Sequence, residues 1–519
     1  MQNLNKRIIT VSLILAGLGT VSARAGEDGG KRRNIALQET AQRNCLWNGS
    51  TSEAGLAFAP YGIFNTLTLD YDGKYGAFRR NGDGKSSSGV SLNTSGAAYI
   101  GKFLARGGFS FKDTFDKDAL YNVLLYEIED NMPFYPVDDK SSGWNRQEYR
   151  LNAGLSSPVL WNRVSFGLSI DYSAKVGAKQ LDPRGETFKY GVTVRPSVAV
   201  RLAEKSILGV SGSYSDSFER SKVSNNNNWV NPAVWEHRGL GESTQGRVGG
   251  NDGMKTHTYR SDRYGAAIQY SYGDIVFVEA GYERRTTSGI ENPGLPKRLG
   301  SIKEDGVNLD AAWIFGRDKS NKLSLDAGFS LTKGLEYVQK LNTTAYQQEW
   351  TLISTNEMSS FTQANAKLGY DHLFGASDQR GYSWKVGAEV SFDLLQESYL
   401  SPASTLDAMR VYGGLLADKN FKFRRGSSLI IGLHAGYAAG FGAGYDARGT
   451  GTHETPKAML CDQADYLNAS HLRAGGRIDW TFAQSRRVSW TLGAKASYLR
   501  AFSLGKDRTV CSASIGILF

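Results

Sequence analysis

The C-terminal stretch, residues 509–519, constrains the fold of this chain more than any other part of the sequence. Its residues alternate between two faces, and a period of two is typical of a β-strand. One face carries Phe519, Ile517, Ile515, Ala513 and Cys511, and the other carries Leu518, Gly516, Ser514 and Ser512. One apolar face and one face of mostly small residues suit the last strand of a transmembrane β-barrel, which meets lipid on one side and the lumen on the other.

The same alternation recurs along most of the chain. It is clearest in residues 164–172, 192–202, 323–331, 384–394 and 488–498. Such strands reach about ten residues, the length that a tilted strand needs to cross a bilayer. A soluble β-sandwich would alternate as well, but here short and long connections alternate, as they do in membrane barrels. The short ones lie near 101–102, 160–162, 203–205, 273–274, 317–321, 375–381, 423–426 and 484–486, and notably long ones lie at 117–146, 219–257 and 445–463.

We therefore predict an all-β fold, a transmembrane antiparallel up-and-down barrel over residues 62–519. The count of strands is eighteen, with sixteen as the alternative if one pair is split. The first strand is expected near Thr66–Tyr75, paired with the last. Because proline cannot donate a hydrogen bond to a neighbouring strand, we expect a bulge or a missing bond at Pro196.

The composition agrees with this fold although it resembles that of a soluble protein. The mean hydropathy is −0.38 and 22% of the residues are charged, and a barrel averages out as polar because only alternate residues face lipid. Aromatic residues near short turns predict a girdle at the membrane surface. They are Trp384, Trp480, Trp490, Phe374 and Phe482. The net charge of +10 is better explained by a polar lumen and anionic lipid than by a polyanion, so no nucleic-acid partner is expected.

The N-terminus carries a predicted signal peptide, residues 1–25. A basic start and an apolar run precede a cleavage site of the A-x-A type at residues 23–25, so cleavage is expected after Ala25. Residues 26–61 are predicted to form an N-terminal periplasmic segment or a small plug, with a short helix near Ile35–Ala41. This piece is several times shorter than the plug of a TonB-dependent receptor, so its length disfavours that class.

The inward positions of the predicted strands carry charges of both signs. Such charges need water or each other, because an unpaired charge in a dry interior is very costly. Side chains alone cannot fill a barrel of this size, so we expect either a channel or a lumen closed by the N-terminal piece and infolded loops. Whether the charges select a solute or only solvate the wall stays open. The lumen-facing candidates are Arg195, Arg201, Asp171, Asp326, Lys385, Glu389, Arg473, Arg477, Asp479 and Lys495.

The sequence lacks the residue patterns of an enzyme. No nucleophile motif and no His pair with metal-ligand spacing is present, so we predict no catalytic residue, no metal and no cofactor. A metal site at His453-Glu454 and Cys461-Asp462 is a weak alternative. Three cysteines exclude a framework of disulfides, but a single bond between Cys45 and Cys461 stays open.

The long loops offer a second class of function. Trp229 and Trp235 follow a run of asparagines, and exposed tryptophans and asparagines would bind a sugar or another protein. The alternative is a disordered or infolded loop. In a different loop, Leu124, Leu125 and Ile128 have helical spacing, so a short helix over the barrel mouth is expected within Leu120–Tyr135.

With the signal peptide, the strand series and the terminal Phe519 together, the mature chain resembles a Gram-negative outer-membrane β-barrel. Ile515, Ile517 and Phe519 resemble the signal by which such barrels are recognised for assembly. Leu46-Trp47 and Ala54-Gly55-Leu56 resemble an uncharacterised family of barrels of about this length. A likeness to long-chain fatty-acid channels is fainter, because the Asn-Pro-Ala motif of their hatch occurs here only in an outer loop, at residues 231–233.

This resemblance implies a protein of the cell outer membrane that passes a small solute through a mixed-charge lumen. The alternative is a closed barrel that acts through its long outer loops as a surface-binding protein or as the structural partner of another transport system. The expected partners are outer-membrane lipid and lipopolysaccharide, the barrel-assembly machinery and, in the alternative, a partner transport protein.

Overall fold

The computed structural model describes residues 33–59, 62–125, 131–227, 229, 232–240, 243–248, 255–292, 294–344, 347–376, 380–423, 426–447, 453–483 and 488–519. The predicted signal peptide and the predicted turn at 484–486 lie outside the described residues. Among the residues described, no helix is both long and apolar enough to cross a membrane.

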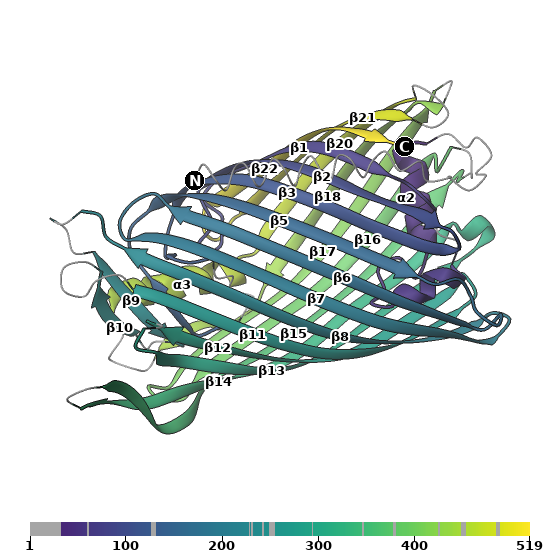
Figure 1. Ribbon diagram of the computed structural model, residues 1–519. Coiled ribbons are helices and arrows are strands. Elements are labelled where there is room, and N and C mark those ends of the chain that lie inside the picture. Colours follow the sequence, from purple (N-terminus) through teal and green to yellow (C-terminus); the bar gives the residue numbers. More distant parts are fainter. Residues whose placement is uncertain are drawn as a thin grey trace.

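The chain forms one closed antiparallel barrel (Figure 1). Its sheet has nineteen strands, of which β19 (Gly444–Ala447) pairs only with β17 near the rim, so eighteen strands close the barrel. The prediction of eighteen strands is confirmed. The barrel strands are β1 (Thr66–Tyr75), β2 (Ser86–Ile100), β3 (Phe103–Ala119), β5 (Ser142–Ser156), β6 (Val164–Lys179), β7 (Arg184–Ala203), β8 (Ser206–Ser224), β11 (Lys255–Tyr272), β12 (Val276–Glu291), β13 (Lys297–Phe315), β14 (Asn321–Thr343), β15 (Gln348–Phe374), β16 (Trp384–Tyr399), β17 (Ser404–Lys422), β18 (Ser428–Gly440), β20 (His471–Ala483), β21 (Ser489–Ala501) and β22 (Lys506–Leu518).

The first and last strands close the barrel as the sequence predicted. β1 covers the expected residues and pairs with β22, with Leu69 opposite Ile515. Two further backbone hydrogen bonds, of 3.0 and 2.9 Å, join Asn65 to Phe519 in both directions. The predicted short turns that the structure describes lie with Phe519 at one end, called the turn end. The other end, called the loop end, carries the long connections together with short turns such as 180–183 and 502–505. In β7, the pairing with β8 stops at Val194 and resumes at Ser197, which confirms the expected gap at Pro196.

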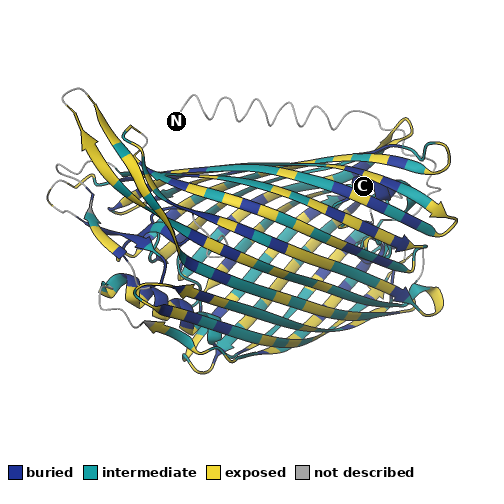
Figure 2. Ribbon diagram, turned by 90° about the horizontal axis from the view of Figure 1, so that it is seen from below, coloured by how far each residue is buried: buried dark blue, intermediate teal, exposed yellow. Residues whose placement is uncertain are grey.

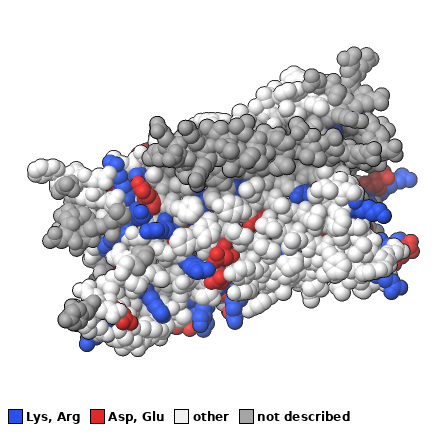
Figure 3. All heavy atoms as spheres, viewed as in Figure 1, with Lys and Arg blue, Asp and Glu red and all other residues white. Residues whose placement is uncertain are grey.

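Exposure alternates from residue to residue along the strands (Figure 2), as it does where successive side chains point to opposite faces of a sheet. The outer surface carries exposed apolar side chains such as Phe166, Leu168 and Ile170 of β6. Charged side chains on the face shown in Figure 3 gather toward the two ends and the loop-end half, and leave a largely uncharged belt toward the turn end. The predicted girdle residues Trp384, Trp480, Trp490 and Phe374 are all more than 40% exposed on this outer surface.

The loop end carries several elements beyond the barrel (Figure 1). β4 (Phe134–Val137), β9 (Ala233–Arg238) and β10 (Ser243–Arg247) form a three-stranded sheet, α3 (Glu454–Asn468) lies close to it, and the β14–β15 hairpin projects past the rim. The turn end carries α2 (Ile35–Asn44) and the 3₁₀ helices η1 (Glu53–Phe58) and η4 (Arg317–Lys319).

The predicted helix within Leu120–Tyr135 is wrong for the described residues of that stretch. Residues 120–125 contain no helix, and β4 begins at Phe134. Its apolar side chains contact different parts of the wall: Leu124 packs with Tyr259, and Leu125 packs with Trp144. These two leucines therefore pack at separate places on the wall and do not form the single helical face that their spacing in the sequence predicts.

Candidate functional site

The N-terminal segment, residues 33–59, lies inside the barrel at the turn end (Figure 1). Its helix α2, close to the predicted Ile35–Ala41, begins after Asn34, whose side chain accepts a hydrogen bond of 2.8 Å from the Leu37 amide. Asparagine is a strong N-cap because its oxygen satisfies one of the free amides of the first turn. The chain then passes to η1, which packs against β5, β6, β7 and β8.

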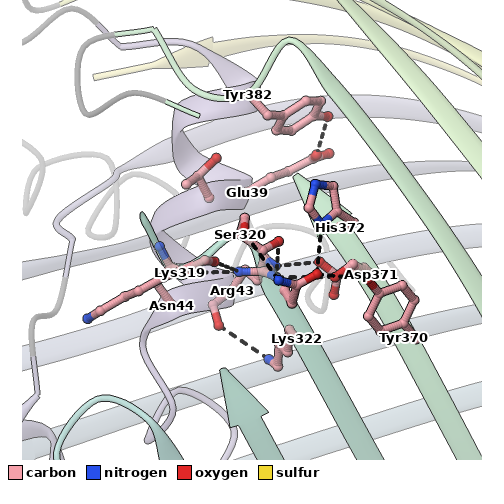
Figure 4. A network of polar contacts seen from close by, with 12 residues as sticks. Glu39, Arg43, Asn44, Lys319, Ser320, Lys322, Tyr370, Asp371, His372 and Tyr382 are labelled. Carbon is pink, nitrogen blue, oxygen red and sulfur yellow. Dashed lines mark hydrogen bonds and ion pairs between the residues drawn. The ribbon is translucent and has the colours of Figure 1, made fainter. Parts of the chain in front are cut away.

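Arg43 joins α2 to the wall through one network (Figure 4). Its guanidinium forms an ion pair with Asp371 of β15 and donates hydrogen bonds to the backbone oxygens of Lys319 (2.9 Å) and Ser320 (3.1 Å). Lys322 donates in return to the backbone oxygen of Arg43 at 3.2 Å. The helix is therefore bound to two neighbouring strands and to the turn that precedes them.

A second anchor lies one turn earlier in α2. Glu39 accepts hydrogen bonds from Arg477 at 2.7 Å and from the Tyr382 hydroxyl at 2.7 Å. Arg477 also forms ion pairs with Asp418 at 2.7 Å and Asp479 at 3.5 Å. This guanidinium therefore joins Glu39 of the N-terminal segment to two carboxylates on the nearby wall strands β17 and β20. Of the two predicted lumen-facing residues here, Arg477 contacts the N-terminal segment directly, and Asp479 pairs with Arg477.

The third anchor is the pair of Glu53 and Arg106. Two hydrogen bonds of 2.6 and 2.7 Å join both carboxylate oxygens to the guanidinium, and the Glu53 side chain is 1% exposed. Close by, Glu279 of β12 accepts hydrogen bonds of 2.7 Å from the hydroxyls of Ser50 and Thr51. Each charge of the anchor is thus matched, as a buried charge must be.

Trp47 fills the space between these anchors. Its indole nitrogen donates a hydrogen bond of 3.1 Å to Ser271, and its ring packs edge-on against Phe277 at 5.1 Å between ring centroids. The ring also covers Gly55 so closely that an added Cβ would lie 1.8 Å from it. The Leu46-Trp47 and Ala54-Gly55-Leu56 motifs therefore meet in one packing contact.

The disulfide left open by the sequence is absent among the described cysteines. Cys45 is buried beside Trp47 at the turn end, Cys461 is exposed on α3 at the loop end, and both are free thiols, as is Cys511. Burial raises the pKa of the Cys45 thiol to about 11, so it stays protonated and unreactive near neutral pH.

The loop end is crossed by the connection between β3 and β5, whose described residues 120–125 and 131–141 are called the infolded loop. On one side, the Leu125 amide donates a hydrogen bond of 3.1 Å to Glu219 of β8. On the other side, the Asn131 amide group donates to Gln363 of β15 at 2.9 Å. The described parts of the loop also contact Tyr259 of β11, Ile302 of β13 and Thr332 of β14, so they lie along the wall from β8 to β15.

Apolar contacts provide most of the packing of the infolded loop. Phe134 is 1% exposed and packs with Tyr259 and Ile302 of the wall. Val123 packs with Val223 and with two valines of the long β8–β11 connection. Near its end, Asp138 forms an ion pair with Lys179, and both side chains are fully buried. Burial outweighs the attraction of Lys179 and raises the pKa of Asp138 to about 6.

The two predicted loop tryptophans lie in opposite environments. Trp229 is 97% exposed. Trp235 is 7% exposed and packs in β9 with Val137, Leu240 and side chains of α3. The prediction that Trp235 is exposed is therefore wrong, because this side of the three-stranded sheet packs on α3 and on barrel residues that include Tyr399 and Leu406. The described residues contain no group of His, Cys, Asp and Glu side chains that would hold a metal ion.

The N-terminal segment and the infolded loop are called the two closures. Between them lies a lumenal cavity of about 980 Å³. Thr51 of the N-terminal segment lines it on one side, and Leu124 and Met132 of the infolded loop line it on the other. Its wall is formed by β5 to β8 and β11 to β15. The cavity therefore lies inside the barrel, in contact with both the N-terminal segment and the infolded loop, and it remains partly open to solvent.

Only two of the ten predicted lumen-facing residues line this cavity. Asp171 and Arg195 lie on neighbouring strands of its wall and form an ion pair. Arg201 lies nearer the turn end, 5.2 Å over the ring of Phe58. Glu389 pairs with Lys367 at 2.8 Å on the far wall.

The remaining predicted lumen residues lie on the same inward face of other strands. Asp326 stands directly opposite Asp310 in the β13–β14 pairing. Lys495 of β21 pairs with Arg477 of β20. Arg473 lies four residues before Arg477 in β20, on the same face of the strand. Lys385 lies two inward positions from Glu389 in β16. At the end of the chain, Ile515 and Phe519 are exposed on the outer surface, on the same face as Ile517.

Sequence reasoning missed the residues that close the lumen. Glu53, Arg106 and Glu39 had no signal, because their partners are distant in sequence and no local pattern links them. The infolded loop had a partial signal, since Phe134 belongs to an apolar run that the sequence reading had assigned to a helix. Such pairings depend on the closed barrel, which brings distant strands to face each other.

Solved structures similar to this chain include three transport proteins. The toluene transporter TodX of Pseudomonas putida is 12% identical with a TM-score of 0.30, and the match covers 92% of this chain and 96% of that one. A FadL homologue of Pseudomonas aeruginosa is 13% identical with a TM-score of 0.35, covering 92% and 97%. The ferric yersiniabactin uptake receptor FyuA of Yersinia pestis is 9% identical with a TM-score of 0.39, covering 88% and 79%.

No curated protein matches the chain. One family model does match, over residues 53–519, which includes η1 and the whole barrel. Its description agrees with the predicted resemblance to an uncharacterised family of barrels. The chain therefore belongs to the family described as a family of unknown function (DUF6850).

Proposed function

We propose that this protein is a gated outer-membrane transport barrel, which holds a small solute in its lumenal cavity between two closures. The observation that carries the proposal is the cavity of about 980 Å³ between Thr51 of the N-terminal segment and Leu124 and Met132 of the infolded loop. A barrel with only a structural role has no need of a large cavity of mixed polarity inside its wall. The closures favour gated permeation over an open pore.

The outer surface supports placement in a membrane. Apolar side chains cover it toward the turn end, and tryptophans lie near the turns, as amphipathic rings do at a membrane surface. The proposed orientation puts the turn end in the periplasm. Leu325 shares its face with exposed Phe329 and Leu331, so Leu325→Arg would cost about 2–4 kcal/mol of folding free energy in a bilayer. Asp326→Arg, one residue along and facing the lumen, would cost much less, and equal costs would contradict the membrane placement.

Planar-bilayer conductance tests the gating directly. The wild-type barrel is expected to be closed most of the time, and a deletion of residues 33–59 combined with Phe134→Ala, which weakens the infolded loop, is expected to conduct. Folding of each variant is checked by electrophoresis, in which an unheated folded barrel migrates differently from the same protein after heating. A folded double variant that leaves the bilayer sealed would exclude permeation.

Exposure of Trp229 supports a second candidate function. Its side chain is 97% exposed in the long β8–β11 connection, and an exposed indole is a common anchor for a protein or sugar partner. In this alternative the barrel is closed and binds at the cell surface, where it serves another transport system. The sealed outcome of the conductance experiment would favour this candidate.

A further inference from the structure

The cavity wall carries an unusual number of hydroxyl groups. In β8, every inward position from 211 to 217 is a serine, and all four serines line the cavity. The neighbouring strands β6, β7, β11 and β12 add Ser173, Thr193, Ser261 and Thr287. Side-chain amides line the same cavity from strands on both sides of this track: Asn152 of β5, Asn308 of β13, and Gln363 and Asn365 of β15. The wall therefore presents both donors and acceptors that carry no charge.

Several of these hydroxyls have hydrogen-bonding capacity to spare. Ser173, Ser213 and Ser217 have no side-chain hydrogen bond to any of the residues that the structure describes. Thr193 and Ser215 bond each other at 2.7 Å, and Thr287 donates to Ser261 at 2.9 Å. Each hydroxyl has one donor and two acceptor sites, so even the paired ones have sites left for a solute.

The charges of the wall are already neutralised. Every basic side chain that lines the cavity has a carboxylate within 3.9 Å. The pairs are Arg195 with Asp171, Arg263 with Glu283, Arg285 with Glu304, Lys189 with Glu219, and both Arg150 and Lys175 with Glu148. Because each cation of this wall already has a carboxylate partner, the wall offers a charged solute no unmatched basic side chain among the described residues.

Size and polarity narrow the solute further. A volume of about 980 Å³ lies at the upper end of the usual range for small-molecule sites. A hydrocarbon would strip water from the hydroxyls and amides without replacing their hydrogen bonds, which costs free energy for each group. The remaining class is a neutral solute with many hydroxyl groups.

We propose that the cavity receives a neutral saccharide, from a disaccharide to a short oligosaccharide, recognised by the serine track of β8 and by the amides that line the same cavity. This inference rests on the proposed transport function and names the solute class of the same cavity. Recognition is by hydrogen bonds to sugar hydroxyls.

Equilibrium binding to the full mature chain tests the proposal. The protein is held in a detergent without a sugar headgroup, and isothermal titration calorimetry compares maltotriose, trigalacturonate and decane. Maltotriose is expected to bind, and the acidic and apolar probes are not. Binding of trigalacturonate or decane in place of maltotriose, or of none of the three, would overturn the saccharide assignment.

Neighbouring threonines of β12 provide a matched pair of variants. Thr287 faces the cavity, and Thr286 faces outward and is exposed. Thr287→Val removes one hydroxyl without changing side-chain shape, and with Ser213→Ala and Ser217→Ala it is expected to weaken maltotriose binding about tenfold or more. Thr286→Val should leave the affinity unchanged, and equal effects at both threonines would place the saccharide elsewhere.

Failure of this inference differs from failure of the proposed function. If the variant without residues 33–59 and with Phe134→Ala conducts but maltotriose binds neither it nor the wild-type protein, the transport barrel stands and the saccharide class is wrong. If the folded variant stays sealed, the transport function itself is wrong.

Discussion

The two closures of the lumen are built in different ways. The N-terminal segment is joined to the wall mainly by matched charges, at Arg43, Glu39 and Glu53, around one tryptophan. The infolded loop has one fully buried ion pair, Asp138 with Lys179, and is otherwise joined by hydrogen bonds of uncharged groups such as Asn131 and by apolar packing around Phe134 and Val123. The difference matters for gating, because the cost of separating charges depends on whether water reaches them, whereas apolar packing is lost only when the contact itself opens.

The two closures are therefore expected to respond to different kinds of substitution. The N-terminal segment is expected to respond to single changes in charge, because removal of one partner leaves a buried charge unmatched. The infolded loop is expected to respond to changes in volume. The variants below test that difference, and channel opening in planar bilayers is the shared measurement.

The largest effect is expected from Glu53→Ala. It leaves the Arg106 guanidinium without its buried partner and weakens docking of the N-terminal segment by about 3–5 kcal/mol. Proteolysis within residues 33–59 should become faster, and the barrel should open more often. Lys333→Ala, in a surface pair with Glu357, is the control and should cost under about 1 kcal/mol. Equal effects would show that the anchor is not buried in solution.

Phe134→Ala is expected to weaken the infolded loop by about 3 kcal/mol, because it empties a packed site and removes a ring from the Tyr259–Ile302 cluster. The loop end should open while the N-terminal segment stays protected from protease. Phe502→Ala, at an exposed turn between β21 and β22, is the matched control. A change in protection of residues 33–59 would mean that the closures are coupled.

Gly300→Ala tests the volume argument in the opposite sense. The added Cβ would lie 2.2 Å from the Phe134 ring, so the loop must shift at a cost of about 1–3 kcal/mol. Gly212→Ala, where nothing lies within 4 Å of the new Cβ, controls for the loss of a strand glycine. If both variants behave as wild type, Phe134 does not contact β13 in the docked loop.

The smallest effect is expected from pH, through Asp138 of the infolded loop. Burial raises its pKa to about 6, above the ordinary value of about 3.9. The docked loop therefore favours the protonated carboxyl, and this stabilisation is complete below about pH 4 and is lost as pH rises through 6. Opening of the loop should increase on the order of tenfold from pH 5 to pH 7. In Asp138→Asn that increase should disappear, and an unchanged pH response would assign it to another group.

The barrel itself was predictable because its information is local. Alternation along each strand fixes which side faces lipid, as in β6 and β22, and the turns fix the order of the strands. The aromatic girdle and the gap at Pro196 follow from the properties of single residues. The inward orientation of Asp171 and Arg195 followed from the same period of two, and so did their placement on neighbouring strands.

The sequence by itself determined the strands, their faces and their antiparallel order, because each depends on neighbours along the chain. Only the tertiary structure decided which inward charges meet, that Glu53 reaches Arg106, and that Phe134 folds into the lumen. Barrel closure brings residues separated by hundreds of positions across the same space, as it does for Glu39 and Arg477. The cavity on which the proposed function depends therefore forms only in the tertiary structure.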